Sequence, residues 1–177
     1  LDASDLDTGE LDAVVPGYVL GRQTTVRGAI EPLAQAFFFD ATESDDLLAF
    51  RRRGQEPVAT IPAQQLLPLD DRTLESWRER RTQEVELPER LSVVYMDRDA
   101  DYQQGSQAAK RVAVHSRHQA SLTLAMAIDA TTAKRIAERT LVSAWLERSG
   151  YTANLPPDWL RLEPTDVVDV VLASGSV

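Results

Sequence analysis

One long stretch of helical periodicity, set among short strand-like stretches, limits the fold of this chain more than any other feature. After Asp129, apolar residues recur at spacings of three and four, as on the buried face of a helix. The stripe consists of Ala133, Ile136, Ala137, Leu141, Ala144 and Trp145. Ile128 and Asp129 supply a hydrophobic staple and an N-cap, and Gly150 supplies a C-cap. We therefore predict a helix over residues 130–149.

The stretches around this helix have the two-residue period of strands, or are too short for a helix. Ser121–Met126 gives the clearest alternation. The other strands predicted after residue 90 are Leu91–Met96, Tyr151–Leu155 and Val167–Leu172, with an extended polar ribbon over Tyr102–Val114 and turns at Asp97–Asp101 and Glu163–Asp166. This part of the chain therefore predicts a sheet that carries one long helix.

The first part of the chain predicts a second helix and a hairpin. Thr24 or Thr25 caps a helix over Val26–Phe37, and Pro32 inside it predicts a kink or a late start. The predicted strands are Val14–Leu20, Phe38–Ala41, Leu47–Arg53 and Val58–Ile61. The polar residues Thr42–Asp46 join the middle two as a hairpin. The flanking prolines Pro57 and Pro62 confine the last strand to a sheet edge or to its own ends.

Together these elements predict an α+β fold. A small helix-on-hairpin part is followed by a mostly antiparallel, barrel-like sheet with the long helix. The predicted parts are an acidic linker or tail over residues 1–12, a helix-plus-hairpin subdomain over 13–67, a charged connection over 68–90, and a β-rich subdomain over 91–177 with the helix at 130–149. The chain begins at Leu1 rather than Met, which predicts a piece of a longer polypeptide, although a trimmed tag or a processed precursor also explains this start.

Composition excludes several classes of protein. The net charge of −9 argues against a broad phosphate-binding surface. The absence of cysteine excludes disulfides and thiolate metal sites, and no apolar run approaches the ~20 residues of a membrane span. Three arginines, Arg51–Arg53, follow the acids Asp40, Glu43, Asp45 and Asp46, so we expect cross-strand charge pairs rather than phosphate binding.

No motif indicates catalysis, and we predict no catalytic, cofactor-binding or metal-binding residue. His115 and His118 lie three apart in an extended segment, which would place them on opposite faces. The acids Asp97, Asp99 and Asp101 are typical of a solvated turn. Phe37–Phe39 is expected in the core rather than as a stacking platform for bases. Trp145 is expected in the core, whereas Trp77 and Trp159 are candidate contact residues, with packing under a loop as the alternative.

The order of segments carries a family resemblance. The segments are Val14–Leu20, Val26–Phe37, Phe39–Ser44, Leu48–Gly54, Glu86–Leu91, Tyr95–Gln103, Ala133–Arg148 and Leu162–Val168. This order resembles the tail-tip hub region of the host-specificity, or baseplate hub, proteins of long-tailed phages and gene transfer agents, over about residues 10–172. The usual Glu-Pro-Gly-Asp-Val turn of such hubs corresponds to Glu163–Val167, in which Thr165 replaces the glycine.

The resemblance implies a structural role without enzymatic activity or a cofactor. Such hubs form a trimeric ring in the virion tail, between the distal ring of the tail tube and the tip. The implied partners are two further copies of the chain, the distal tail ring, the tape measure and the tip, with DNA only in transit through a channel. A host-surface carbohydrate- or protein-binding module is the alternative, followed by a cell-wall hydrolase domain.

Overall fold

The computed structural model describes residues 2–21, 23–70, 72, 74–112, 114–172 and 175–176. Residues 172, 175 and 176 are described by their backbone only. Leu1 and the tail residues Ala173, Ser174 and Val177 lie outside this description. The described residues form two compact units, each built from separate stretches of chain. The first comprises Leu1–Asp12, Phe39–Arg80 and Gly150–Val177, and the second comprises Ala13–Phe38 and Arg81–Ser149.

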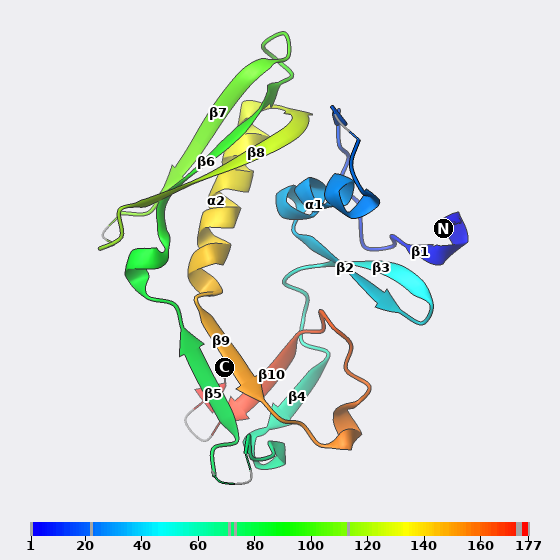
Figure 1. Ribbon diagram of the computed structural model, residues 1–177, viewed down its shortest axis with the longest axis vertical. Helices are drawn as coiled ribbons and strands as arrows, with labels where there is room; N and C mark the ends of the chain where they lie inside the picture. The colour runs from blue at the N-terminus through cyan, green and yellow to red at the C-terminus, as the bar shows by residue number, and fades with distance from the viewer. Residues whose placement is uncertain are drawn as a thin grey trace. The chain divides into compact units, whose positions relative to one another are not determined.

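The second unit is a three-stranded sheet with a long helix across one face (Figure 1). Its elements are α1 (Val26–Phe37), β6 (Pro88–Asp97), β7 (Gln103–Lys110), β8 (His118–Ile128) and α2 (Ala130–Leu146). The strand order is β7-β6-β8, with β6 antiparallel to β7 and parallel to β8. The strands predicted around Leu91–Met96 and Ser121–Met126 are confirmed, and the polar ribbon is β7.

The core of this unit lies between α2 and the sheet. Alternate residues of β6 point toward the helix, where Leu91, Val93 and Tyr95 are buried. The other core residues on these elements are Ala109, Leu124, Met126, Ile128, Ala133, Ile136, Ala137, Leu141 and Trp145. Burying a large aliphatic or aromatic side chain contributes about 1.5–3 kcal/mol, so this cluster is the main source of stability for the unit. The apolar stripe predicted on α2 is thereby confirmed.

The start of α2 matches the sequence prediction and its end does not. The Asp129 Oδ1 accepts a hydrogen bond from Thr132 N at 2.8 Å, as an N-cap does. This bond, together with one from the Thr132 hydroxyl, lowers the pKa of Asp129. The helix ends at Leu146 rather than near residue 149. Beyond the helix the chain enters strand pairing, since Arg148 O accepts a bond from Thr82 N at 2.8 Å and β9 begins at Ser149.

The helix α1 begins at Val26, where Thr25 accepts a hydrogen bond from Gly28 N. Pro32 therefore lies inside the helix, and the predicted late start is wrong. Pro32 has no N–H for the carbonyl of Gly28, so the helix lacks one of its regular hydrogen bonds there. The helix ends where Phe38 adopts a left-handed conformation with φ 57°. Phe38 is buried, and the guanidinium carbon of Arg139 lies 4.1 Å from its ring centroid.

The segment before α1 covers part of the outer edge of β8. The strand predicted at Val14–Leu20 is reduced to one antiparallel bridge, between Tyr18 and Met126. Val19 N donates to Ala125 O, and Ala127 N donates to Gly17 O, both at 2.9 Å.

The first unit contains two three-stranded sheets and a two-stranded ribbon (Figure 1). Its strands are β1 (Leu6–Asp7), β2 (Phe39–Ser44), β3 (Leu47–Arg52), β4 (Ala59–Pro62), β5 (Trp77–Arg81), β9 (Ser149–Ala153), β10 (Val168–Leu172) and β11 (Gly175–Ser176). The last residue of β5 and the first residue of β9 belong to the second unit. The orders are β1-β3-β2, β11-β10-β4 and β5-β9.

The predicted hairpin is confirmed as β2 and β3, with β2 extending three residues further than expected, to Ser44. Only Asp45 and Asp46 form the turn, because both adopt positive φ, at 49° and 63°. Such a two-residue turn matches the twist of the paired strands. The edge position expected for the proline-flanked strand is also confirmed, since β4 is the outer strand beside β10.

The α+β class is confirmed, but two details differ. Among the described residues no sheet closes into a barrel, and the pairs β1–β3, β4–β10 and β6–β8 are parallel. The charged stretch 68–90 also contains β5 and the start of β6, so it is more than a connection. The predicted division into parts with boundaries after residues 12, 67 and 90 stays a prediction.

Candidate interaction sites

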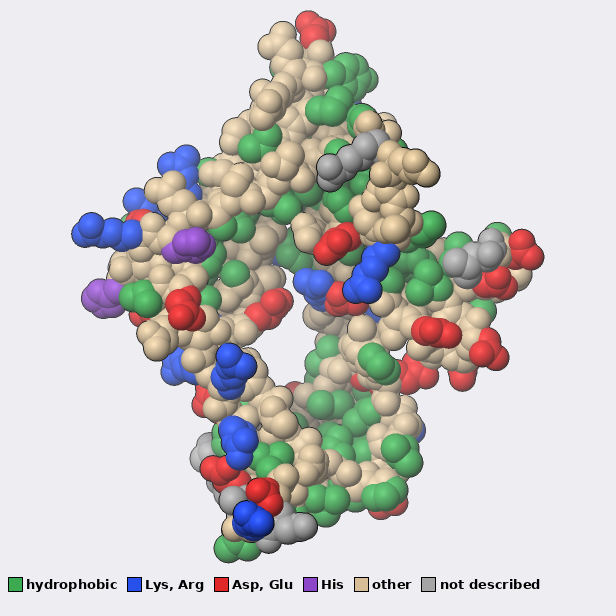
Figure 2. Space-filling model, viewed as in Figure 1, with side chains coloured by type: hydrophobic (Ala, Val, Ile, Leu, Met, Phe, Trp, Pro, Cys, Tyr) green, Lys and Arg blue, Asp and Glu red, His purple; other side chains and the backbone are tan. Residues whose placement is uncertain are grey.

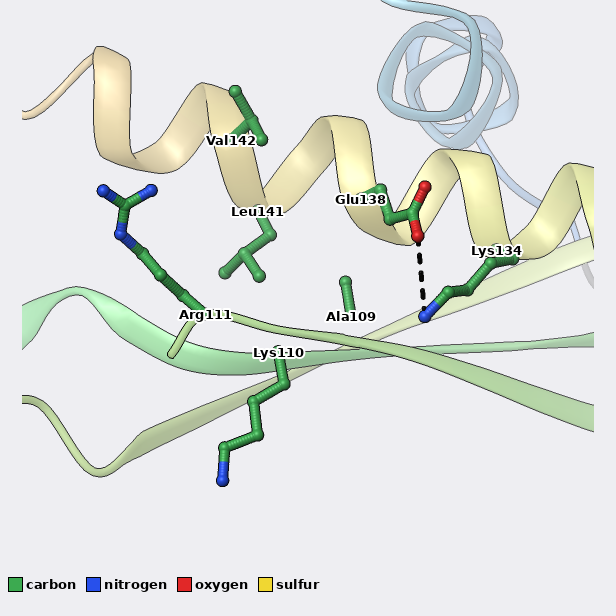
Figure 3. A pocket seen from close by; sticks show the side chains of 7 residues that line it. All are labelled: Ala109, Lys110, Arg111, Lys134, Glu138, Leu141 and Val142. Atoms are coloured by element: carbon green, nitrogen blue, oxygen red, sulfur yellow. Dashed lines mark ion pairs between the residues drawn. The ribbon is translucent and has the colours of Figure 1, made fainter. Parts of the chain in front are cut away.

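A shallow groove between β7 and α2 is a candidate interaction site on the second unit (Figure 3). Its volume is about 200 Å³. The lining residues are Ala109, Lys110, Arg111, Lys134, Glu138, Leu141 and Val142. Ala109 and Leu141 are buried, whereas Val142 is half exposed. The groove therefore has an apolar floor and charged sides.

The cations of the groove are held in different ways. Lys134 Nζ donates to Ala108 O at 2.6 Å and lies 3.6 Å from a Glu138 carboxylate oxygen. Arg111 lies on the α2 side of the strand, with its guanidinium carbon 4.5 Å from the centroid of a Trp145 ring. This is an ordinary cation–π distance. Figure 3 shows Lys110 pointing away from α2.

Sequence reasoning did not find this groove. Lys110 and Arg111 end a polar strand, and Lys134 lies more than twenty residues later on a helix. The only local signal was the four-residue spacing of Lys134 and Glu138, which is common on solvated helix faces. Only the packing of α2 against the sheet brings these residues together.

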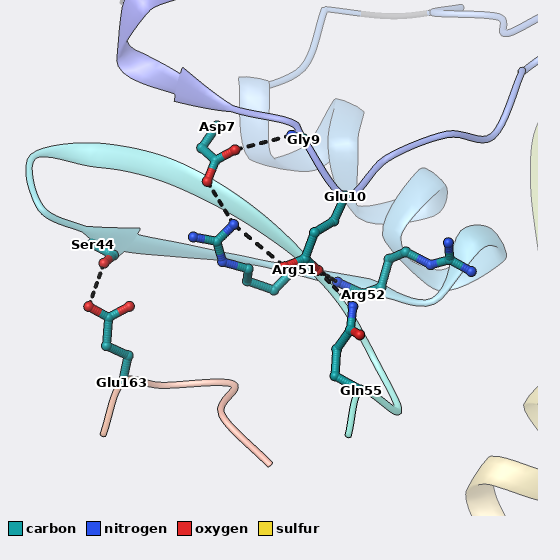
Figure 4. Close-up of polar contacts among 8 residues, drawn as sticks. All are labelled: Asp7, Gly9, Glu10, Ser44, Arg51, Arg52, Gln55 and Glu163. Carbon is teal, nitrogen blue, oxygen red and sulfur yellow. Dashed lines mark hydrogen bonds and ion pairs between the residues drawn. The ribbon is translucent and has the colours of Figure 1, made fainter. Parts of the chain in front are cut away.

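A second polar cluster joins the acidic N-terminal segment to β3 (Figure 4). Arg51 Nη1 lies 2.7 Å from Asp7 Oδ2 and 3.6 Å from Glu10 Oε1. Arg52 N donates to Glu10 Oε2 at 2.9 Å, and its side chain pairs with Asp12 at 3.3 Å. We name residues 2–12 the acidic strap. Its β1 residues pair in parallel with β3, which places the carboxylates beside the arginines.

These contacts correct two expectations. Of the predicted charge pairs, the one between Arg53 and Asp40 is observed, at 2.7 Å, whereas Arg51 and Arg52 turn to the strap. The strap carboxylates are therefore not simply solvated. A backbone bond from Gly9, and then the bond from Arg51, lower the pKa of Asp7. Figure 2 shows acidic side chains gathered over the part of this face that carries the strap and the β2–β3 hairpin.

The tryptophans lie mostly against their own neighbours. Trp145 is buried, as predicted, and its Nε1 donates to Pro88 O at 2.9 Å. Trp77 is half buried and stacks on Tyr151 with ring centroids 5.7 Å apart. Trp159 is half buried, and its Nε1 donates to Gln65 Oε1 at 2.9 Å. Phe38 and Phe39 are in the core, which confirms the expectation for Phe37–Phe39, with Phe37 packed partly against it.

The remaining candidate groups occupy structural positions. Asp97 Oδ1 accepts a bond from Asp99 N at 3.0 Å, so this acid caps the turn between β6 and β7. His115 and His118 are exposed. Within the described part of the chain, no three His, Cys, Asp or Glu residues gather as a metal site. None of the described helices is long and apolar enough to cross a bilayer.

The predicted turn at Glu163–Asp166 contains a residue with a positive φ angle. Glu163 N donates to Asp166 Oδ2 at 2.9 Å, and Asp166 N donates to Glu163 O at 3.1 Å. Between them Thr165 has φ 83°, a left-handed conformation that favours glycine. Ser44 Oγ donates to Glu163 Oε1 at 2.7 Å, which links this turn to the end of β2. The turn keeps the geometry expected for a glycine although threonine occupies it.

Comparison with known proteins places this fold. Residues 25–176 match the family model Phage-tail_3, described as "Putative phage tail protein". The chain belongs to this family of phage tail proteins. The predicted location in the tail of a phage or phage-like particle is thus confirmed.

Two solved structures resemble this phage tail protein. One is a chain of the virion of a native gene transfer agent particle, at 26% identity and a TM-score of 0.91, over 98% of this chain and 39% of that chain. The other is a tail protein from Neisseria meningitidis MC58, at 15% identity and a TM-score of 0.63, over 94% of this chain and 50% of that chain. The second likeness shows the fold alone. This chain therefore spans half or less of the length of these two chains. No curated protein matches it.

Proposed function

We propose that this tail protein is part of the hub of a phage or phage-like tail tip, which connects the tail tube to the tip. The observation that carries the proposal is the match of almost the whole chain to a chain of a gene transfer agent virion, at a TM-score of 0.91. That chain is more than twice as long, which supports a role as one part of a larger host-specificity protein.

A threefold ring is the assembly we propose for the hub, with the distal tail ring, the tape measure and the tip as neighbours. Several apolar side chains of the second unit support contacts with other subunits, because they lie on the surface. Val14, Leu20 and Val26 are 83%, 62% and 68% exposed. Such side chains gain stability when a neighbouring subunit removes them from water.

DNA passes through the proposed ring without binding to it. The net charge of −9 supports this, since an acidic wall repels phosphate and lets a duplex slide. Lysines placed at acidic positions of the channel wall should slow DNA ejection. Unchanged ejection would contradict the role of the acids and leave the hub proposal in place.

Electron microscopy of intact particles tests the hub role. A peptide tag inserted in the exposed turn at residues 98–100 of the full-length protein is labelled with a tag-specific antibody fragment. We expect label at the junction of tube and tip, with three copies per particle. The matched control carries the tag on the tube protein and labels the whole tube. Label along the tube, or a copy number of one or six, would contradict the proposal.

The mass of the isolated chain, measured by light scattering over a range of concentrations, gives an independent view of the ring. We expect a trimer at the highest concentrations. A dimer, stable on dilution, would contradict threefold assembly.

A host-surface binding module is the second candidate, and the structure favours it less. Trp77 and Trp159, the residues that would contact a sugar, are half buried and engaged with Tyr151 and Gln65. A glycan array probed with this chain distinguishes the two roles. Binding that is lost in a Trp77→Ala variant would support the module.

A further inference from the structure

We propose that the outer edge of β7 and the groove beside it bind an extended segment of a different protein chain. On the side that faces α2, this segment carries an apolar residue and a carboxylate two positions apart. The proposal goes beyond the hub role and does not depend on it.

The backbone of β7 offers an edge for such a segment. β7 is an outer strand of its sheet. Arg111 N donates to Glu89 O on the β6 side, so in this antiparallel register the backbone N–H and C=O groups of Arg111, Ala109 and every second residue before them point toward β6. Ala108 and Lys110 lie between these residues, so their backbone N–H and C=O groups point to the outer edge. Lys134 covers one of these groups, the Ala108 carbonyl, at 2.6 Å. A lysine at a strand edge protects it from unspecific pairing, and its flexible side chain can be displaced.

The groove gives the edge a place for one apolar side chain. Ala109 points toward α2, where it forms the floor together with Leu141. Val142 is 50% exposed at the side of the groove, although it is aliphatic. A residue of the added strand opposite Ala109 would lie on the same face of the sheet and cover Val142. A branched aliphatic side chain fits a pocket of about 200 Å³.

The charge of the groove predicts the second residue of the segment. Lys134 and Lys110 already pair with Glu138 and Glu89, at 3.6 and 3.2 Å. Arg111, in contrast, has no carboxylate partner among the residues that the structure describes, in a chain with a net charge of −9. Arg111 lies two residues after Ala109, and therefore on the same face. A carboxylate opposite Arg111, two positions from the apolar residue, would complete a cross-strand pair.

A different chain fits this edge better than a second copy does. A second copy could offer the outer edge of its own β7 or of its β8. Neither strand contains Asp or Glu, so neither supplies the carboxylate that Arg111 lacks. The edge of β8 has a further disadvantage. That edge is partly covered by its own N-terminal segment, through the bonds of Gly17 and Val19 to Ala127 and Ala125. A segment from another protein meets no such obstacle.

The test is an NMR titration of the ¹⁵N-labelled 177-residue chain with two synthetic peptides. The first is six residues long, with valine and glutamate two apart among threonines, and the second has lysine in place of glutamate. We expect the first peptide to shift the amide signals of Ala108 and Lys110 and the indole N–H of Trp145, and the second to bind at least fivefold more weakly. Shifts outside β7 and α2, or equal binding of both peptides, would overturn the proposal.

Three variants and one control make the test specific. Arg111→Gln should weaken the glutamate peptide about fivefold, and Arg111→Glu should reverse the preference toward the lysine peptide. The matched control is Arg117→Gln, which removes an exposed arginine of the same unit outside the groove and should change nothing. Val142→Ser alters an exposed position and should also weaken binding while the spectrum stays dispersed. Shifts of β7 amides with protein concentration alone would show that a second copy uses this edge, which contradicts the proposal.

Discussion

Gly105 provides a direct test of packing in the second unit. It lies on β7 opposite Tyr95 of β6, which is 2% exposed in the core. A Cβ at this position would lie 2.8 Å from Cζ of Tyr95, where ordinary contacts begin at 3.4 Å. The ring would have to move by about 0.6 Å. Its hydroxyl donates to Asp97 Oδ2 at 3.3 Å, so this movement would also disturb the turn after β6.

We expect Gly105→Ala to lower the free energy of unfolding by about 1–2 kcal/mol. Overpacking a core costs about 1–3 kcal/mol. Alanine also restricts the unfolded chain more than glycine does, which offsets about 0.4–1 kcal/mol of this destabilisation. At a slope of about 2 kcal/mol per molar urea, the unfolding midpoint should fall by about 0.5–1 M.

Urea unfolding followed by tryptophan fluorescence measures this change. In a Trp77→Phe, Trp159→Phe background, Trp145 is the sole tryptophan and reports on the second unit. Gly21→Ala is the matched control, because a Cβ there meets no atom within 4 Å, and its midpoint should stay the same or rise slightly. A Gly105→Ala variant as stable as its parent would refute the packing argument.

Three further predictions concern a turn, a cap and the acidic strap. Thr165→Gly should raise the free energy of unfolding by about 1 kcal/mol in urea unfolding, because it relieves a φ of 83° at a β-branched residue. Asp129→Ala should lower it by about 1 kcal/mol at pH 7. Since the pKa of Asp129 is lowered from 3.8 in the folded state, its contribution is present above pH 3.8 and is lost as the pH falls further, so parent and variant should converge there. Arg51→Gln should speed amide exchange at Asp7 several-fold, since it removes the ion pairs of Arg51 with Asp7 and Glu10.

Each of these has an outcome that would contradict it. A less stable Thr165→Gly would mean that the threonine side chain makes a contact worth more than the strain. A stability gap for Asp129→Ala that persists at pH 2 would exclude the carboxylate cap as its cause. Unchanged exchange at Asp7 in Arg51→Gln, with Arg53→Gln as the control, would mean that backbone pairing alone holds β1.

The sequence by itself determined the elements whose signals are local. The stripe on α2 and the cap at Asp129 lie within one stretch of chain, so helix periodicity and capping chemistry locate them. The edge position of β4 follows from Pro57 and Pro62, because proline cannot donate in a sheet interior. The order of such segments was also enough to indicate the phage tail family.

Tertiary structure alone decided which segments meet. The parallel pairing of β6 with β8 has no local signal, since both a parallel and an antiparallel partner satisfy alternating side chains. Arg51 had acids nearby in sequence and yet pairs with Asp7, because β1 lies beside β3. The groove at Arg111 likewise exists only because α2 packs on the sheet. Local chemistry fixes each element, whereas contacts between distant residues depend on how all of the elements bury their apolar faces together.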